Sequence, residues 1–287
     1  MSGNYYIFGS KGFIGTSLIN LSIYEYKNVD REQVDLSDIQ SIKSYFSNIA
    51  KVDVLIFLVG RVHKKGKNGS YYQHYDNNFM TLKNLLSAFS QINISIGKII
   101  FTSTVNVYDG SMKNIFYDEE SLLNPKEYYA KTKKIAEDYL IENYVNKYWI
   151  LRLAPVYSKE FQLNIDKRTK IMNFFYKPGK GNNQFSMCNL SNLIISIDKI
   201  IDNKVPSGVY NISDIKEYDY NDLLSYKQAR VKIIIPIFLI KILFSLSQFF
   251  NLKSLESRLS KLFMTRVYTS KKIRSFIDFS AELKDAR

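Results

Sequence analysis

Apolar runs of strand length alternate with stretches of helical period along the first half of the chain. Four runs are candidates for buried strands: Tyr5–Phe8, Val52–Gly60, Gly97–Tyr108 and Tyr148–Tyr157. Apolar positions recur at helical spacing after the first run and again over Asn77–Phe89 and Tyr129–Tyr144. Strands that alternate with helices predict an α/β fold with a Rossmann-type, doubly wound parallel sheet.

The pattern loosens after about residue 158, where a glycine-rich turn (KPGKGNNQ) precedes shorter apolar segments. Neither an internal repeat nor a low-complexity linker separates the two parts. We therefore predict a first domain at residues 1–157 and a smaller region at residues 158–287 that packs partly back on it.

Composition indicates a globular chain, with 46% hydrophobic residues and five prolines among 287 residues. The single cysteine, Cys188, excludes a disulfide within the chain and a metal site built from several cysteines, and no metal is predicted. It also fits a reducing compartment. The residues before the first strand do not have the pattern of a signal peptide, so we expect a cytoplasmic protein.

The net charge of +13 is concentrated near the C-terminus, where residues 227–274 contain eleven Lys or Arg against one acid, Glu256. A uniformly basic surface would suggest nucleic acid, but no nucleic-acid-binding module is visible and the charge lies beside an apolar stretch. The sequence therefore predicts no nucleic-acid partner.

That apolar stretch, Val231–Phe250, approaches the length of a membrane span. Three polar residues, Lys232, Lys241 and Gln248, interrupt it. Pro236 would also break or kink a helix, so these residues argue against a transmembrane segment. One interpretation is a helix or two buried in the substrate-binding region. The other is weak peripheral contact of residues 227–274 with anionic lipid at the inner face of the membrane.

Three glycines, Gly9, Gly12 and Gly15, lie between the first predicted strand and the first predicted helix. In this setting glycine permits a tight turn and lets a diphosphate approach the N-terminus of the helix. A glycine turn that binds no ligand is the alternative at this point.

Tyr129 and Lys133 are four residues apart and so share one helix face. An ammonium beside a phenol stabilises the phenolate and lowers the tyrosine pKa, which suits proton transfer. The alternative is an ordinary solvated helix face.

Two residues with hydroxyl groups, Ser103 and Thr104, lie at the end of a predicted strand upstream. Hydrogen bonding at the end of the strand would also explain them.

Three stretches in order, GSKGFIG, STVNVY and YYAKTK, resemble the extended short-chain dehydrogenase/reductases of the NAD-dependent epimerase/dehydratase family that act on nucleotide sugars. The resemblance covers residues 4–157. It implies that Thr104 donates a hydrogen bond to the reacting sugar oxygen, with Ser103 as its neighbour and a one-residue ambiguity between them. Tyr129 would exchange the proton, and Lys133 would tune Tyr129 and bind the nicotinamide ribose. It also implies a homodimer paired through the helices that contain Tyr129 and Asn77.

The resemblance further implies that residues 1–157 form a dinucleotide-binding domain and that residues 158–287 form a smaller substrate-binding region. It places a cofactor site across the first domain. Its expected residues are Gly9, Lys11, Gly12, Phe13, Ile14, Gly15, Asp30, Arg31, Asp35, Leu36, Leu58, Val59, Gly60, Asn77, Thr102, Ser103, Tyr129, Lys133, Ala154 and Val156.

The cofactor is expected to be NADP or NAD. Arg31 and Lys11 offer cations to a 2′-phosphate, whereas Asp30 suits a free 2′-hydroxyl, and we favour NADP(H).

The short connection after the second strand resembles the reductases of the family. The first hypothesis is therefore a nucleotide-sugar 4-ketoreductase in surface polysaccharide biosynthesis. A 4-epimerase with tightly bound NAD is the second, and a non-catalytic dinucleotide-binding sensor is the third.

Two positions depart from the family pattern in the stretch GNNQFSMCNLSNL. Asn182 stands where an arginine often holds the diphosphate, and Asn189 replaces an aspartate. Lys180 is the nearest candidate to replace the missing cation.

Overall fold

The computed structural model describes residues 3–60, 70–108, 116–231 and 233–286. Contacts divide the chain into two compact units, each described here by itself. Unit 1 comprises residues 1–107, 125–152 and 194–210, and unit 2 comprises residues 108–124, 153–193 and 211–287. The units are interleaved along the chain, and the predicted domain boundary at residue 157 lies near one of their junctions.

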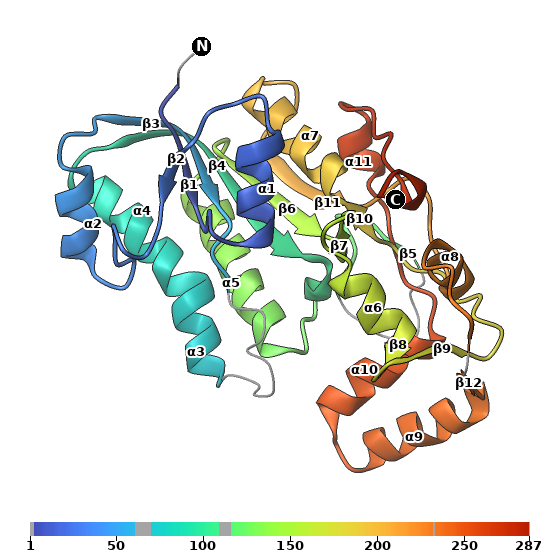
Figure 1. Cartoon of the computed structure of the whole chain (residues 1–287). Helices are drawn as coiled ribbons and strands as arrows, with labels where there is room; N and C mark the ends of the chain where they lie inside the picture. The colour runs from blue at the N-terminus through green and yellow to red at the C-terminus, as the bar shows by residue number, and fades with distance from the viewer. Residues whose placement is uncertain (1–2, 61–69, 109–115, 232, 287) are drawn as a thin grey trace. The chain divides into compact units, whose positions relative to one another are not determined.

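A six-stranded parallel sheet in the order β11-β6-β4-β3-β1-β2 organises unit 1 (Figure 1). Its strands are β1 (Tyr5–Phe8), β2 (Lys27–Val29), β3 (Lys51–Phe57), β4 (Ser95–Thr104), β6 (Tyr148–Leu153) and β11 (Gly208–Ile212). The predicted Rossmann-type α/β fold is therefore confirmed. Three predicted strands end earlier than expected, which leaves Leu58–Gly60, Val105–Tyr108 and Ala154–Pro155 as connections after the carboxyl ends of β3, β4 and β6.

Helices cover both faces of this sheet. They are α1 (Phe13–Leu21), α2 (Ile39–Phe46), α3 (Tyr71–Tyr75), the π-helix η1 (Asp76–Met80), α4 (Thr81–Gln91), the 3-10 turn η2 (Val105–Val107), α5 (Tyr128–Asn143) and α7 (Leu190–Ile201). Apolar residues of α2, α4 and α5 share one core cluster with apolar residues of β1, β3 and β4. On the other face, Ser22 after α1 donates to Asp198 of α7 at 2.5 Å.

Unit 2 consists of shorter elements around an aromatic core. They are β5 (Phe116–Tyr117), β7 (Val156–Tyr157), α6 (Leu163–Thr169), β8 (Lys170–Ile171), β9 (Phe174–Pro178), β10 (Cys188–Asn189), α8 (Tyr220–Tyr226), β12 (Ile233–Ile235), α9 (Ile237–Phe249), α10 (Lys253–Phe263), β13 (Val267–Tyr268), α11 (Lys271–Arg274) and the 3-10 turn η3 (Leu283–Ala286). Tyr157, Tyr218, Tyr220 and Tyr226 belong to one buried cluster of this unit.

The apolar stretch Val231–Phe250 forms β12 and α9, with Pro236 at the N-cap of the helix. Only Ile240, Phe244 and Ser247 of α9 are buried, so the prediction of a buried helix is wrong. The reason is that α9 packs along one side against α10, as Figure 1 shows in orange. Among the described residues, no helix is both long and apolar enough to cross a membrane.

Candidate active site

The glycine turn between β1 and α1 leaves no room for a Cβ at Gly15 and holds Gly9 at a positive φ. Gly9 has φ +89°, and the N–H of Gly12 donates to the carbonyl oxygen of Gly9 at 3.1 Å. A Cβ on Gly15 would lie 2.4 Å from that same oxygen. The first turn of α1 contains no acidic side chain, so its dipole is available to an anion. The main chain can therefore approach a diphosphate closely.

A cleft of about 830 Å³ in unit 1 opens beside this turn. Eleven of the predicted residues line it: Gly9, Lys11, Gly12, Asp30, Arg31, Asp35, Leu36, Leu58, Val59, Gly60 and Asn77. The prediction missed further lining residues, namely Phe8, Ser10, Val29, Glu32, Val34, Ser37 and Thr81. Most of these directly neighbour a predicted residue in sequence, which is the signal that would have found them. Phe13, Ile14 and Gly15 form the first turn of α1 and are not among the lining residues.

Opposite charges pair where β2 meets the cleft. The Lys11 ammonium lies 3.1 Å from a carboxylate oxygen of Asp30 and 3.1 Å from one of Glu32. Hydrogen bonds from Lys11 and from the Glu32 N–H lower the pKa of the Asp30 carboxyl. Arg31 also lines the cleft. This end of the cleft therefore presents two carboxylates and two cations, rather than cations alone.

Lys133 of α5 is buried, and its ammonium lies at the end of β3. Its Nζ donates to the carbonyl oxygen of Val59 at 3.2 Å and lies 4.5 Å from the centre of the Phe101 ring. A Cβ on Gly60 would approach the same nitrogen to 3.2 Å. Burial lowers the pKa of Lys133 to about 7, although the Glu137 carboxylate opposes this. The lysine thus lies directly beside two cleft-lining residues.

Tyr129 lies one turn before Lys133 on α5, as the spacing predicts. Burial raises the pKa of its phenol to about 12. The predicted lowering of the Tyr129 pKa is therefore not found in the chain by itself. Burial of the phenol causes this rise, and the Lys133 ammonium is directed to Val59 and Phe101.

The two hydroxyls at the end of β4 have different partners. Ser103 donates to the Glu137 carboxylate, which also forms an ion pair of 2.8 Å with Arg152. Thr104 Oγ1 accepts a hydrogen bond from the Asn106 N–H at 3.2 Å. The hydroxyl proton of Thr104 takes no part in this hydrogen bond. Thr102 donates to the carbonyl oxygen of Phe57 at 3.4 Å. Ser103 therefore belongs to a buried network with Glu137 of α5 and Arg152 of β6.

The asparagine that ties the π-helix η1 to α5 is Asn78. Its amide donates to Thr132 of α5 at 3.0 Å, and its side chain is fully buried. The predicted residue, Asn77, lines the cleft and donates to the carbonyl oxygen of Gln73 at 2.7 Å within its own helical stretch. The sequence analysis therefore missed the buried hydrogen bond between Asn78 of η1 and Thr132 of α5.

Ala154 and Val156 belong to unit 2. The Ala154 N–H donates to the carbonyl oxygen of Ile212 at 3.0 Å, and Val156 pairs with Cys188 between β7 and β10. Cys188 is a buried residue, and burial raises the pKa of its thiol. Among the described residues, no group of three or more His, Cys, Asp or Glu is placed to hold a metal ion.

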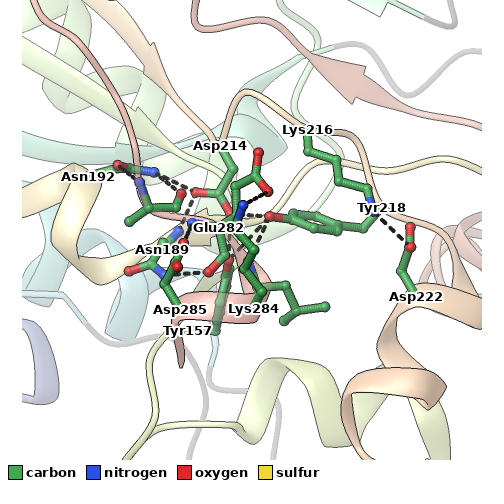
Figure 2. A network of polar contacts seen from close by, with 12 residues as sticks. Tyr157, Asn189, Asn192, Asp214, Lys216, Tyr218, Asp222, Glu282, Lys284 and Asp285 are labelled. Carbon is green, nitrogen blue, oxygen red and sulfur yellow. Dashed lines mark hydrogen bonds and ion pairs between the residues drawn. The ribbon is translucent and has the colours of Figure 1, made fainter. Parts of the chain in front are cut away.

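A buried carboxylate, Asp214, organises unit 2 (Figure 2). One of its oxygens accepts hydrogen bonds from the backbone N–H of Asn189 at 2.6 Å and from the side-chain amide of Asn192 at 2.9 Å. Its other oxygen accepts hydrogen bonds from the hydroxyls of Tyr157 at 2.6 Å and Tyr218 at 3.0 Å. Burial raises the pKa of Asp214 to about 6, and these donors oppose the shift. Asn189 therefore serves this network rather than supplying the carboxylate that the family pattern has at its position.

The residues of unit 1 fit a dinucleotide. A Cβ would fill the cradle between Gly9 and Gly15, the helix dipole faces it, and the buried Lys133 lies at the far end of the Val59–Gly60 edge. A glycine cradle at a helix N-terminus is the kind of site that holds the diphosphate of a dinucleotide.

Solved structures show the same fold at low identity. The structure of dTDP-4-dehydrorhamnose reductase from Bacillus anthracis in complex with NADP aligns with a TM-score of 0.65 and 20% identity, over 82% of this chain and 84% of the other. The structure of UDP-glucuronic acid 4-epimerase from Bacillus cereus in complex with NAD aligns with a TM-score of 0.68 and 17% identity. The alignment covers 98% of this chain and 93% of the other.

Among curated proteins, the chain is similar to N-acetyl-alpha-D-glucosaminyl-diphospho-ditrans,octacis-undecaprenol 4-epimerase of Escherichia coli O157:H7. The two are 28% identical over 255 residues, which cover 82% of this chain and 75% of the relative. The family model of the NAD dependent epimerase/dehydratase family matches residues 5–213. The chain therefore belongs to this family, the extended short-chain dehydrogenase/reductases that act on nucleotide sugars.

Proposed function

We propose that the chain is an NAD-dependent sugar 4-epimerase whose substrate is a sugar attached through a diphosphate. The observation that carries the choice of cofactor is the pairing of Lys11 with Asp30 and Glu32. Lys11, one of the two cations that the sequence offered to a 2′-phosphate, is paired with these carboxylates, which would repel that group. A carboxylate at the end of β2 instead suits the free 2′-hydroxyl of NAD. This reverses the preference for NADP(H) drawn from sequence.

NAD also favours an epimerase over a reductase. An epimerase recovers the hydride in every cycle and needs no external reductant, whereas a reductase consumes its cofactor. The similarity to a curated 4-epimerase supports the same choice. The 4-ketoreductase remains a second candidate because Arg31 also lines the cleft, where it could meet a 2′-phosphate.

Thr104, Tyr129 and Lys133 are the proposed catalytic residues. The engagement of Ser103 with Glu137 supports Thr104 as the hydroxyl that donates to the sugar oxygen. Tyr129 takes the proton from the 4-hydroxyl as the hydride leaves carbon 4, and it returns the proton after the 4-keto sugar has presented its other face. Lys133 binds the nicotinamide ribose and, in its protonated form, favours the phenolate of Tyr129. NAD, when bound, supplies a reversible hydride acceptor.

The carrier on the diphosphate is a nucleotide or a polyprenol. Family membership favours a nucleotide, and the name of the curated relative gives a sugar diphospho-undecaprenol. A homodimer paired through α5 and α4 is part of the proposal, and sedimentation at micromolar concentration tests it.

The decisive experiment compares cofactor turnover with sugar turnover. Purified protein is denatured and its ligand identified by mass spectrometry, and the protein is incubated with epimer pairs of UDP-sugars and of polyprenyl-diphosphate sugars. Interconversion of epimers with bound NAD and no net NADH is expected. Stoichiometric NADPH consumption with a 4-keto sugar would instead establish the reductase.

Two variants test the residues. Tyr129→Phe should lower turnover at least about a hundredfold because the proton carrier is lost. Lys131→Met, at an exposed position of the same helix, is the control for altering α5 and should retain most activity. Normal turnover in Tyr129→Phe would refute the assignment of Tyr129 as the proton carrier. Absence of any turnover in the unmodified protein with NAD bound would favour the hypothesis of a non-catalytic dinucleotide-binding sensor.

A further inference from the structure

Helix α9 has three distinct faces. Its buried residues, Ile240, Phe244 and Ser247, lie on one side, and Lys241, Ser245 and Gln248 form an exposed polar strip beside it. The remaining face is apolar and exposed. It consists of Phe238, Leu239, Ile242, Leu243, Leu246 and Phe249, which we call the α9 apolar face. At about 100° per residue it spans roughly 140° of the helix circumference.

The exposure of the α9 apolar face is large for such bulky side chains. Phe238 is 62% exposed, Ile242 53% and Phe249 81%. Phe250 and Leu252, which follow the helix, are also exposed. Single exposed apolar residues are common in globular proteins, but a contiguous stripe along a whole helix marks an interaction surface.

The α9–α10 pair is held by its own small core. Ile240, Phe244 and Leu259 form a buried cluster separate from the other clusters of the described residues. The pair therefore keeps its shape without using the apolar face, which remains available for contact with another body.

The sequence segment that contains this surface is strongly positive. Residues 227–274 contain eleven Lys or Arg and one acid, and that acid, Glu256, accepts from the Gln248 amide at 3.3 Å. Lys241 on the polar strip, Arg258 on α10 and Arg230 before β12 are all exposed. An apolar stripe flanked by cations is the arrangement that binds the interface of an anionic bilayer.

Charge also discriminates between occupants. Pairing two copies through this face would bring two cation-rich segments together, which costs energy unless counter-ions intervene. An anionic lipid surface instead gains energy from both the apolar stripe and the cations. Nucleic acid would satisfy the cations but not the apolar stripe.

We propose that the α9 apolar face docks on an anionic membrane and lies in its interface without crossing it. The proposal deepens the proposed function and rests on it in one respect, namely that docking gives the enzyme access to a sugar diphosphate whose polyprenyl carrier is embedded in the same bilayer. Binding to the bilayer itself requires no substrate.

Vesicle flotation of the full chain tests the docking. Vesicles of phosphatidylcholine with about one third phosphatidylglycerol should carry the protein upward at low salt, and vesicles of phosphatidylcholine alone should carry much less. Replacing Phe238, Leu243 and Leu246 together by serine should lower binding at least about tenfold, because large apolar side chains are no longer buried. The matched control replaces Leu21, Ile23 and Val145, three exposed apolar residues of unit 1, by serine and should bind normally.

Two further variants separate the contribution of charge. Lys241→Gln and Arg258→Gln should each weaken binding about fivefold at low salt, and the loss should shrink as salt is raised. Failure of the unmodified protein to float, or flotation equal in the serine variant and its control, would overturn the proposal. Loss of a dimer in the serine variant without any vesicle binding would show instead that the face joins two copies.

Activity distinguishes this proposal from the proposed function. The serine variant should epimerise a soluble UDP-sugar like the unmodified protein, but should lose at least about tenfold in rate on a polyprenyl-diphosphate sugar in vesicles. Flotation without any epimerisation would refute the function and leave the docking. Epimerisation without flotation would do the reverse.

Discussion

Replacing Lys133 by methionine should change how the stability of the protein depends on pH. Burial lowers the pKa of Lys133 from its ordinary 10.5 to about 7, so above neutral pH the native state holds this side chain neutral. The unfolded chain still protonates it until the pH passes its ordinary pKa. Between these two values the unfolded state binds one more proton than the native state, and the free energy of unfolding therefore rises with pH.

The size of the effect follows from this difference in bound protons. One extra proton in the unfolded state gives a slope of about 1.4 kcal/mol per pH unit. The side chain is only 2% exposed, so solvent screening reduces the effect little. Lys133→Met lacks this proton, and the stability of the unmodified protein minus that of the variant should rise by about 2 to 3 kcal/mol between pH 7.5 and 9.5.

Urea unfolding followed by circular dichroism at several pH values measures this difference. Lys131→Met, at an exposed position of α5, shows what the loss of a solvated lysine from the same helix does to the curve. A difference between the unmodified protein and Lys133→Met that stays flat across this range would refute the reasoning. It would mean that Lys133 remains charged in its buried site.

Three further substitutions test the packing that the structure shows. Asp214→Ala leaves four donors without their acceptor and should cost about 3 to 5 kcal/mol in urea unfolding, whereas Asp214→Asn keeps one acceptor oxygen and should cost less than half as much; equal costs would contradict the network. Gly15→Ala places a Cβ 2.4 Å from the Gly9 oxygen and should abolish retention of the dinucleotide, while Gly208→Ala, whose nearest neighbours lie at 3.5 Å, should retain it. Gly60→Ala brings a Cβ to 3.2 Å from the Lys133 ammonium and should lower turnover at least about tenfold with little change in melting temperature; unchanged turnover would show that the position of this ammonium is not critical.

The features that sequence predicted well are local ones. The order of strand, glycine turn and helix around Gly9 and the one-turn spacing of Tyr129 and Lys133 are set by neighbours in the chain, and both appear as expected. The π-helix η1 was harder, because its wider turn alters the register of the helix that contains Asn77. Asn78 consequently faces α5, although an ordinary helical wheel drawn from Asn77 gives no reason to choose it.

Other features depend on partners that are distant in sequence. The pairing of Lys11 with Asp30 and Glu32 joins the glycine turn to the end of β2, and nothing in either stretch alone shows that the cation is already neutralised. The face of α9 is a similar case. Its composition predicted an apolar helix, but whether such a helix is buried depends on how many sides its neighbours cover, and α10 covers only one.

The shifted pKa values of Tyr129 and Lys133, the proposed catalytic pair, have a consequence for control of the chemistry. Burial raises the pKa of Tyr129 to about 12 and lowers that of Lys133 to about 7, so it disfavours the charged form of both side chains, and a neutral phenol is a poor base. Activation therefore requires charge from outside the pair. An oxidised nicotinamide carries a positive charge and would stabilise the phenolate, whereas the reduced ring would not. The proton acceptor is then most effective when a hydride acceptor is present, so that proton abstraction from the sugar is coupled to the oxidation it serves.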